Sequence, residues 1–304
     1  METYDFCFAW SWPYDRDFVG VLEGVCQEKQ ISLLQVTPAD LEEVLLALTT
    51  DQLWFNAFFD RASDVEESFY PLAEWAYRQD LEYINRFWLA RRTWDKGTMH
   101  GQFTRSGLDA PYTVVLPSYL EKPDLPALDL GPFGNNYAIK PAHGGGGAGV
   151  IVGALSWEQI LQARQQNPQD QYLLQAKVTP AQLNGRPAWF RVIYCLGKIF
   201  PCWWDPSTHL YVPISEIEVD EMELNPLVDI TTRIAQLSRL EIFSTEVAYT
   251  PGKRFLVVDY INDPIDLRLQ SRIPQGVPDM IVQAIARELA AHVSGLCVKG
   301  IAHA

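Results

Sequence analysis

The sequence lacks long apolar runs, paired cysteines and an excess of positive charge. No stretch approaches the roughly 20 apolar residues that a membrane-spanning helix needs, so we expect no membrane segment. The five cysteines are scattered and contain no CxxC pair, which favours reduced thiols over disulfides or a zinc site. A formal net charge of −14 argues against nucleic-acid and anionic-membrane partners, because both need basic patches.

These absences favour a cytoplasmic protein with small-molecule partners. Residues 1–5 lack the positive charge of a signal peptide, which agrees with a cytoplasmic location. The chain of 304 residues is 48% hydrophobic and 12% aromatic, enough for one large domain or two to three smaller ones with packed cores. If the ligand is anionic, the positive groups that bind it must be few and local.

The first 95 residues alternate between strand and helix patterns. Strand patterns fall at residues 5–12, 31–36, 53–59 and 83–89, and helix patterns at 18–29, 38–48 and 64–77. Repeated βα units predict a mostly parallel sheet with helices on both faces.

The rest of the chain combines single helices with strand pairs. Helices are predicted at 95–107, 156–166, within 223–240 and at 278–296, and strands at 110–116, 172–178, 189–196, 198–204, 241–249 and 254–261. Residues 117–136 carry four prolines without periodicity and are predicted to form a surface loop or a connection between domains.

Residues 137–150 contain the most distinctive stretch, Tyr-Ala-Ile-Lys-Pro-Ala-His-Gly-Gly-Gly-Gly-Ala-Gly-Val. An apolar strand delivers Lys140, five glycines follow between Gly144 and Gly149, and a β-branched run begins at Val150. Glycine lets a ligand approach the peptide N–H groups, and such groups in a concave turn bind phosphate. The stretch therefore predicts strand, glycine turn and strand, with the turn lying over phosphates.

The glycine stretch also resembles other glycine-rich motifs. The spacing of Gly144, Gly146 and Gly149 matches the dinucleotide-binding pattern, but that pattern requires a helix after the glycines, and a β-forming run follows here. A P-loop is excluded because no Gly-Lys-Ser/Thr follows. A flexible glycine linker remains as the structural alternative.

Two acids on a predicted hairpin form the second candidate site. A two-residue turn at Pro251-Gly252 would set position 246 opposite 257 and position 244 opposite 259. An apolar face would then hold residues 243, 247, 249, 256 and 258. Glu246 and Asp259 would be diagonal neighbours on the other face, suited to Mg²⁺ together with substrate phosphates. Asn262 would face away unless the strand bulges, and a solvated hairpin face is the alternative.

Four basic residues form the third element. They are Lys96, Lys140, Arg191 and Arg268. A surface position is the simplest interpretation of each lysine and of Arg268. Arg191 differs because it lies among apolar residues of a strand, where an arginine usually has an anionic partner.

In this order, the pieces resemble the ATP-grasp superfamily, in particular glutathione-synthetase-like carboxylate–amine ligases. The matching run over about residues 83–270 comprises Asp95-Lys96, 108–113 (Leu-Asp-Ala-Pro-Tyr-Thr), Ile139-Lys140-Pro141 with the glycine stretch, 174–178 (Leu-Gln-Ala-Lys-Val), 190–194 (Phe-Arg-Val-Ile-Tyr), Glu246 and 259–262 (Asp-Tyr-Ile-Asn). The family's last metal motif is usually Glu-x-Asn, whereas here the acid and the amide are three residues apart.

The resemblance implies an α/β protein in which an N-terminal βα (pre-ATP-grasp) domain, residues 1–95, precedes two α+β lobes, residues 96–180 and 181–304. It implies that ATP is bound by Lys96, Lys140, His143, Gly144, Gly145, Gly146, Gly147, Gln175, Ala176, Lys177 and Val178. Glu246, Asp259 and Asn262 would carry Mg²⁺. Arg191, Lys140 and Arg268 would be the catalytic residues.

The implied chemistry is ATP-dependent ligation of small-molecule carboxylate and amine substrates through an acylphosphate, with ADP as product. A kinase acting on a hydroxyl and a nucleotide-binding protein without turnover remain alternatives, and the altered spacing of Asp259 and Asn262 is the best support for the latter. Substrate specificity is expected from residues 1–30 and the region of Trp203 and Trp204. The resemblance leaves a homodimer open.

Overall fold

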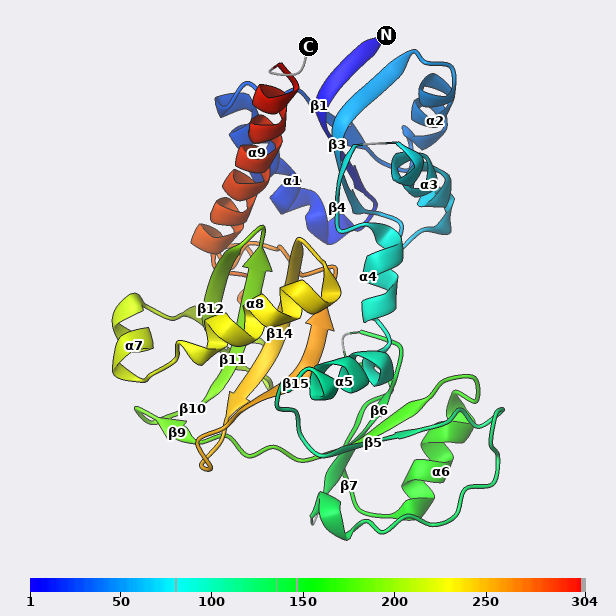
Figure 1. The fold of residues 1–304 in the computed structure, drawn as a ribbon, viewed down its shortest axis with the longest axis vertical. Coiled ribbons are helices and arrows are strands. Elements are labelled where there is room, and N and C mark those ends of the chain that lie inside the picture. Colours follow the sequence, from blue (N-terminus) through cyan, green and yellow to red (C-terminus); the bar gives the residue numbers. More distant parts are fainter. Residues whose placement is uncertain (80, 135, 146, 302–304) are drawn as a thin grey trace.

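The computed structural model describes residues 1–301 except positions 80, 135 and 146, with side chains described up to residue 296. Within them, the strands form one four-stranded sheet from residues 2–84, another from 113–176 and a five-stranded sheet from 189–262, besides a two-stranded hairpin. Figure 1 shows the three sheets one after another along the longest axis of the molecule. We call the bodies built on the second and third sheets the small lobe and the large lobe.

The N-terminal sheet is parallel, as the alternation of strand and helix patterns predicted. Its strands run in the order β2-β1-β3-β4 and comprise β1 (Glu2–Trp10), β2 (Leu33–Val36), β3 (Leu53–Arg61) and β4 (Glu82–Ile84). Helix α1 (Arg16–Glu28) packs on one face, and α2 (Leu41–Thr49) and α3 (Tyr70–Arg78) pack on the other. Short 3-10 turns, η1 (Pro13–Asp15) and η2 (Glu67–Phe69), precede α1 and α3.

The predicted strand at 83–89 was wrong beyond Ile84. Asn85 has a positive φ of 50°, which ends the extended conformation, and α4 (Phe87–Thr93) follows. The Asn85 side chain accepts hydrogen bonds from the backbone N–H groups of Glu241 and Ile242 at 2.9 Å each. Contacts with a segment more than 150 residues away thus fix this turn.

The last helix, α9 (Asp279–Ile301), returns to the N-terminal sheet. Figure 1 shows it beside α1, and both helices contribute to one apolar cluster with β1. Phe18 and Leu22 of α1 and Ile285 and Leu289 of α9 are fully buried there. The core of the N-terminal sheet therefore contains residues from both ends of the described chain.

The small lobe has the predicted strand, glycine turn and strand. Its sheet runs in the order β5-β8-β6-β7 and comprises β5 (Thr113–Leu116), β6 (Tyr137–Pro141), β7 (Ile151–Ala154) and β8 (Tyr172–Ala176). Helix α6 (Trp157–Gln166) packs against it, and Ser156 caps α6 in a reciprocal capping box with Gln159. Between β5 and β6 the chain is irregular except for η3 (Gly131–Phe133).

The large lobe is a five-stranded antiparallel sheet in the order β13-β12-β11-β14-β15. Its strands are β11 (Trp189–Cys195), β12 (Lys198–Asp205), β13 (Leu210–Pro213), β14 (Ile242–Tyr249) and β15 (Phe255–Asn262), and the small hairpin β9 (Gln182–Leu183) and β10 (Arg186–Pro187) precedes them. Helix α8 (Pro226–Ser238) packs on one face, and α7 (Glu216–Glu221) follows β13. Helix α5 (Lys96–Arg105) joins the core of the same lobe through Met99 and Phe103.

Every helix within the described residues is too short or too polar for a membrane span.

The return of α9 predicts that its core face stabilises the N-terminal sheet. Leu289→Ala removes a fully buried side chain from the shared cluster and should lower the free energy of unfolding by about 3 kcal/mol. Met280→Ala, on the same helix but 69% exposed, is the control and should change it by less than about 0.5 kcal/mol. Urea unfolding followed by circular dichroism measures both, and equal effects would contradict the packing described here.

Candidate functional site

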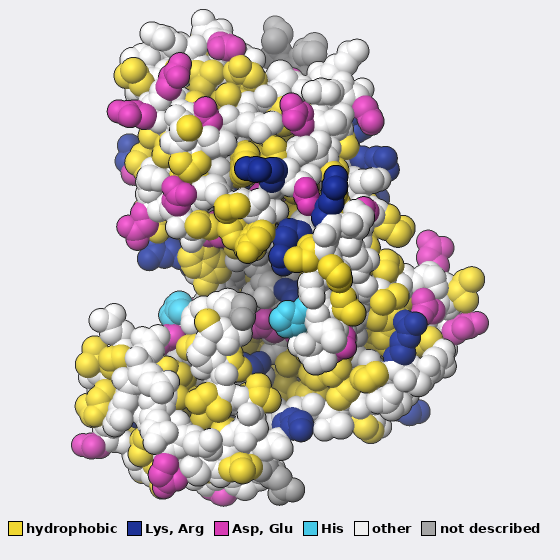
Figure 2. All heavy atoms as spheres, turned by 180° about the vertical axis from the view of Figure 1, so that it is seen from behind, with side chains coloured by type: hydrophobic (Ala, Val, Ile, Leu, Met, Phe, Trp, Pro, Cys, Tyr) yellow, Lys and Arg dark blue, Asp and Glu magenta, His cyan; other side chains and the backbone are white. Residues whose placement is uncertain are grey.

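A cleft separates the small lobe from the rest of the molecule. Figure 2 shows it as a deep notch above the small lobe, with basic, acidic and histidine side chains gathered along its walls. Strand β6 of the small lobe and strands β14 and β15 of the large lobe bring Lys140, Glu246 and Asp259 within electrostatic range of one another. The structure therefore groups the basic and acidic residues that the sequence singled out.

Lys140 lies at the meeting point of the two lobes. Its ammonium donates a hydrogen bond to Oε1 of Gln175 at 2.7 Å and another to the backbone oxygen of Val258 at 3.4 Å. Burial lowers the pKa of Lys140 below its usual value and Lys96 adds to this effect, whereas Asp259 and Glu246 counteract it. Two lysines and two carboxylates thus act on one another electrostatically at this place.

The acid pair is closer than predicted. Glu246 lies directly opposite Asp259, whereas the predicted register made them diagonal neighbours. The pairing shifts on both sides of Glu246, so that Ser244 faces Asn262 and Val247 faces Val257. These irregularities are β-bulges, which insert extra residues into one strand of a pair.

The bulges change which residues of β15 share a face. Ser244 and Glu246 are two apart on β14, so their partners Asn262 and Asp259 lie on the same face although they are three apart in sequence. The bulge thus compensates for the extra residue between Asp259 and Asn262, relative to the Glu-x-Asn motif. The predicted apolar face was wrong for 256 and 258, because Val257 and Tyr260 are the core residues on β15.

Arg191 has the anionic partner that its place in an apolar strand predicted. It faces Glu246 across β11 and β14, and its Nη1 lies 3.0 Å from Oε1 of Glu246. Its Nε donates to Oγ of Ser244 at 3.2 Å, and its guanidinium lies 4.9 Å from the ring centroid of Trp204. Burial raises the pKa of Glu246 and Asp259 adds to this effect, while Arg191 opposes it.

The donor set fits a magnesium ion that is shared with phosphates. Within the described residues, no group of three or more His, Cys, Asp and Glu side chains forms a complete metal cage. Glu246, Asp259 and Asn262 instead supply hard oxygen donors on one face of the sheet. Nδ2 of Asn262 is buried without a hydrogen-bond partner among the described groups, so the fold does not engage this amide nitrogen. Mg²⁺ takes one or two carboxylates and completes its shell with phosphates and water.

The glycine turn is attached to α5 at one end. The Lys96 ammonium donates to the carbonyl oxygen of Gly144, and the Lys96 N–H donates to that of Ala142 at 2.9 Å. Gly144, Gly147 and Gly149 have positive φ values of 121°, 77° and 70°, so side chains there would be strained. Gly145 lies within the turn, and the predicted ligand Gly146 lies outside the described residues.

His143 at the start of the turn is held by Asp170. Its Nδ1 lies 2.8 Å from Oδ1 of Asp170, and its backbone N–H donates to Oδ2 at 3.0 Å. The side chain is 61% exposed. Contact of His143 with a phosphate stays a prediction.

The predicted adenine segment starts inside the sheet. The backbones of Gln175 and Ala176 pair with β6, and the Ala176 N–H donates to the oxygen of Tyr112 at 2.8 Å. The buried Gln175 side chain contacts Lys140. Lys177 and Val178 follow the end of β8, so their backbone groups lie beyond the pairing of β8 with β6. The adenine role of the segment stays a prediction.

Arg268 is paired with a carboxylate two residues before it in the chain. It forms an ion pair with Asp266 at 2.5 Å, and its guanidinium lies 4.7 Å from the Tyr14 ring centroid. Burial alone would lower the pKa of Arg191, yet surrounding groups, Asp266 among them, raise it overall. Sequence reasoning did not single out Tyr14 for contact with Arg268, because the two residues are far apart in the chain.

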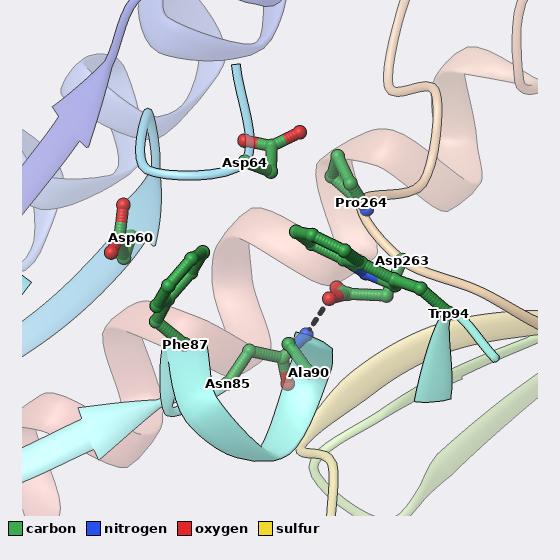
Figure 3. Close-up of a pocket in the computed structure, with 8 residues that line it drawn as sticks. All are labelled: Asp60, Asp64, Asn85, Phe87, Ala90, Trp94, Asp263 and Pro264. Carbon is green, nitrogen blue, oxygen red and sulfur yellow. Dashed lines mark hydrogen bonds between the residues drawn. The ribbon is translucent and has the colours of Figure 1, made fainter. Parts of the chain in front are cut away.

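A small cavity lies between the N-terminal sheet and the end of β15. Figure 3 shows that Asp60, Asp64 and Asp263 line it together with Asn85 and Trp94. Nδ2 of Asn85 donates to Oδ1 of Asp263 at 2.5 Å. Burial raises the pKa of Asp64 to about 6 and that of Asp263 to about 7. The sequence did not predict that Asp60 and Asp64, at the end of β3, meet Asp263, which follows β15.

The raised pKa of Asp64 predicts a pH-dependent stability. The folded state binds the Asp64 proton more tightly than the unfolded chain does. The resulting contribution to the free energy of unfolding is therefore fully present below pH 3.8 and is lost as the pH rises through about 6. Asp64→Asn should therefore stabilise the protein at pH 8 by about 2 kcal/mol, or roughly 4 °C in Tm, and have a smaller effect at pH 5. Asp124→Asn removes an equal charge from an exposed loop and serves as the control. A gain for Asp64→Asn that is the same at both pH values would contradict the raised pKa.

The fold is the ATP-grasp fold, built from the parallel N-terminal sheet, the small lobe with its glycine turn and the large antiparallel lobe. This confirms the fold that the sequence resemblance implied. D-alanine–D-alanine ligase from Bacillus anthracis, complexed with ATP, superposes with a TM-score of 0.64 at 10% identity, covering 98% of each chain.

Two further solved structures show the same likeness. The macrocyclase MdnC from Microcystis aeruginosa, bound with the precursor peptide MdnA, has a TM-score of 0.62 at 11% identity, with 92% of this chain and 97% of that chain covered. A RimK domain ATP-grasp protein from Sphaerobacter thermophilus has a TM-score of 0.58 at 17% identity, with 93% and 99% covered. No protein-family model and no curated sequence matches the chain.

Proposed function

We propose that the protein is an ATP-dependent ligase that joins a carboxylate to an amine through an acylphosphate. The observation that carries the proposal is the direct pairing of Glu246 with Asp259, with Arg191 and Lys140 as the cations that act on Glu246. This arrangement suits a magnesium-bound triphosphate, because it offers oxygen donors to a metal and ammonium groups to phosphates.

The residues have distinct roles in this proposal. Lys96, Lys140 and the N–H groups of the glycine turn would bind the phosphates, while Glu246, Asp259 and Asn262 would hold Mg²⁺. When bound, Mg²⁺ neutralises charge on the phosphoryl oxygens. Arg191 would stabilise the charge on the γ-phosphoryl group as the substrate carboxylate attacks it. The amine then displaces phosphate from the acylphosphate, so the products are the amide, ADP and phosphate.

The substrate side of the site supports an acid with an apolar or aromatic part. Trp204 lies over Arg191, and Tyr14 lies over Arg268. Guanidinium groups bind carboxylates in two-pronged geometry, and aromatic rings beside them favour a partner with a ring or an apolar side chain. Because one compared macrocyclase holds a precursor peptide, peptides are test substrates alongside free amino acids.

Trapping with hydroxylamine tests the ligase chemistry. The protein is incubated with Mg·ATP, hydroxylamine and pools of amino acids or short peptides, and hydroxamate and ADP are measured. The ligase should form both in equal amounts, because hydroxylamine takes the place of the amine at the acylphosphate. ADP formation with a phosphorylated hydroxyl and without hydroxamate would contradict the ligase proposal and support a kinase.

The acid pair predicts that magnesium strengthens ATP binding through Glu246. Glu246→Gln removes the charge but keeps the shape, so it should abolish most of the effect of Mg²⁺ on ATP affinity, which we expect to be about tenfold or more. Glu216→Gln, at an exposed position on α7, is the control and should leave that effect unchanged. Titration of a fluorescent ATP analogue with and without Mg²⁺ measures it, and an unaltered magnesium effect in Glu246→Gln would rule out the assigned metal site.

A further inference from the structure

Tyr260 occupies the bulged part of β15 between Asp259 and Asn262 but lies in the core. It is 2% exposed and belongs to an apolar cluster that contains Met99 and Phe103 of α5 and Leu173 of β8. The Phe103 ring packs edge-on against it at 5.5 Å between centroids. One side chain of the strand that carries the acids therefore packs against both α5 and the small lobe.

The Tyr260 hydroxyl links two polar side chains from different elements. It accepts a hydrogen bond from Nε2 of Gln175 at 3.3 Å and lies 2.8 Å from Nδ1 of His100. The Gln175 NH₂ group also donates to Oγ1 of Thr113 at 3.3 Å. Because its two donors are engaged in this way, the Gln175 amide turns its oxygen toward Lys140, which donates to it at 2.7 Å.

His100 connects this network to α5, the helix that carries Lys96. Burial lowers the pKa of His100, which favours a neutral ring whose Nδ1 accepts a hydrogen bond from the Tyr260 hydroxyl. His100 is four residues after Lys96 on α5, so the two side chains lie one turn apart on the same side of the helix. A continuous chain of hydrogen bonds thus runs from Lys140 through Gln175 and Tyr260 to the helix that carries Lys96.

We propose that Tyr260 is a positioning residue that fixes the two lysines, Lys96 and Lys140, relative to each other for binding of the ATP phosphates. The inference rests on the proposed function, because it assumes that both lysines bind phosphates. The role of Tyr260 would be indirect, because its hydroxyl contacts Gln175 and His100.

The test measures affinities for ATP, ADP and adenosine by competition against a fluorescent nucleotide. Tyr260→Phe keeps the ring and its packing on Phe103 but removes the hydroxyl. This change should weaken the binding of ATP and ADP about five- to tenfold, as expected from the loss of one or two buried hydrogen bonds. The binding of adenosine should weaken less than twofold. Tyr137→Phe is the matched control, because Tyr137 is equally buried and its hydroxyl donates to the oxygen of Ser156 at 2.9 Å.

A second variant breaks the same chain at its other end. His100→Ala should reproduce the selective loss for phosphates, and the double variant should be no weaker than Tyr260→Phe, because both changes remove one connection. Equal weakening of adenosine and ATP, or additive effects in the double variant, would overturn the positioning role. No ATP binding by the wild type would overturn the proposed function itself, so the two failures are distinguishable.

Discussion

The pairing of two half-buried carboxylates across β14 and β15 is the constraint on which the site depends. Glu246 and Asp259 face each other directly, and like charges at that separation are unfavourable unless cations lie beside them. Arg191 supplies one cation from the neighbouring strand, and Lys140 supplies another from the small lobe. A magnesium ion would bind the carboxylate oxygens of this pair. The same two acids are therefore central both to the charge balance of the fold and to the proposed function.

The two lysines of the site also connect the small lobe to the large lobe. Lys140 belongs to β6 of the small lobe, yet it donates a hydrogen bond to the backbone of β15 in the large lobe. Lys96 attaches the glycine turn to α5, and α5 packs in the core of the large lobe. A ligand that draws these ammonium groups to its phosphates would therefore act on contacts between the lobes as well as on the turn itself.

The sequence predicted the local elements of the site well, because they depend on neighbours in the chain. The β-branched run after the glycines indicated a strand, and the apolar surroundings of Arg191 indicated an anionic partner. It could not predict the register of β14 and β15, since the bulges arise from packing of Val257 and Tyr260 against other elements. The turn at Asn85 and the return of α9 to the first sheet depend on similarly distant contacts. For the same reason, Gln175 was expected to act through its backbone, whereas the fold also engages its side chain with Lys140.

Calorimetric titration of ATP, with and without Mg²⁺, into the wild type and Lys140→Ala tests the central claim most directly. Lys29→Ala, at an exposed position after α1, controls for the loss of a positive charge. The account predicts magnesium-dependent binding to the wild type and the control, with the affinity of Lys140→Ala reduced tenfold or more, because its ammonium is the proposed phosphate ligand at the meeting point of the lobes. Equal binding by all three proteins, or no heat of binding at millimolar ATP in any of them, would contradict it.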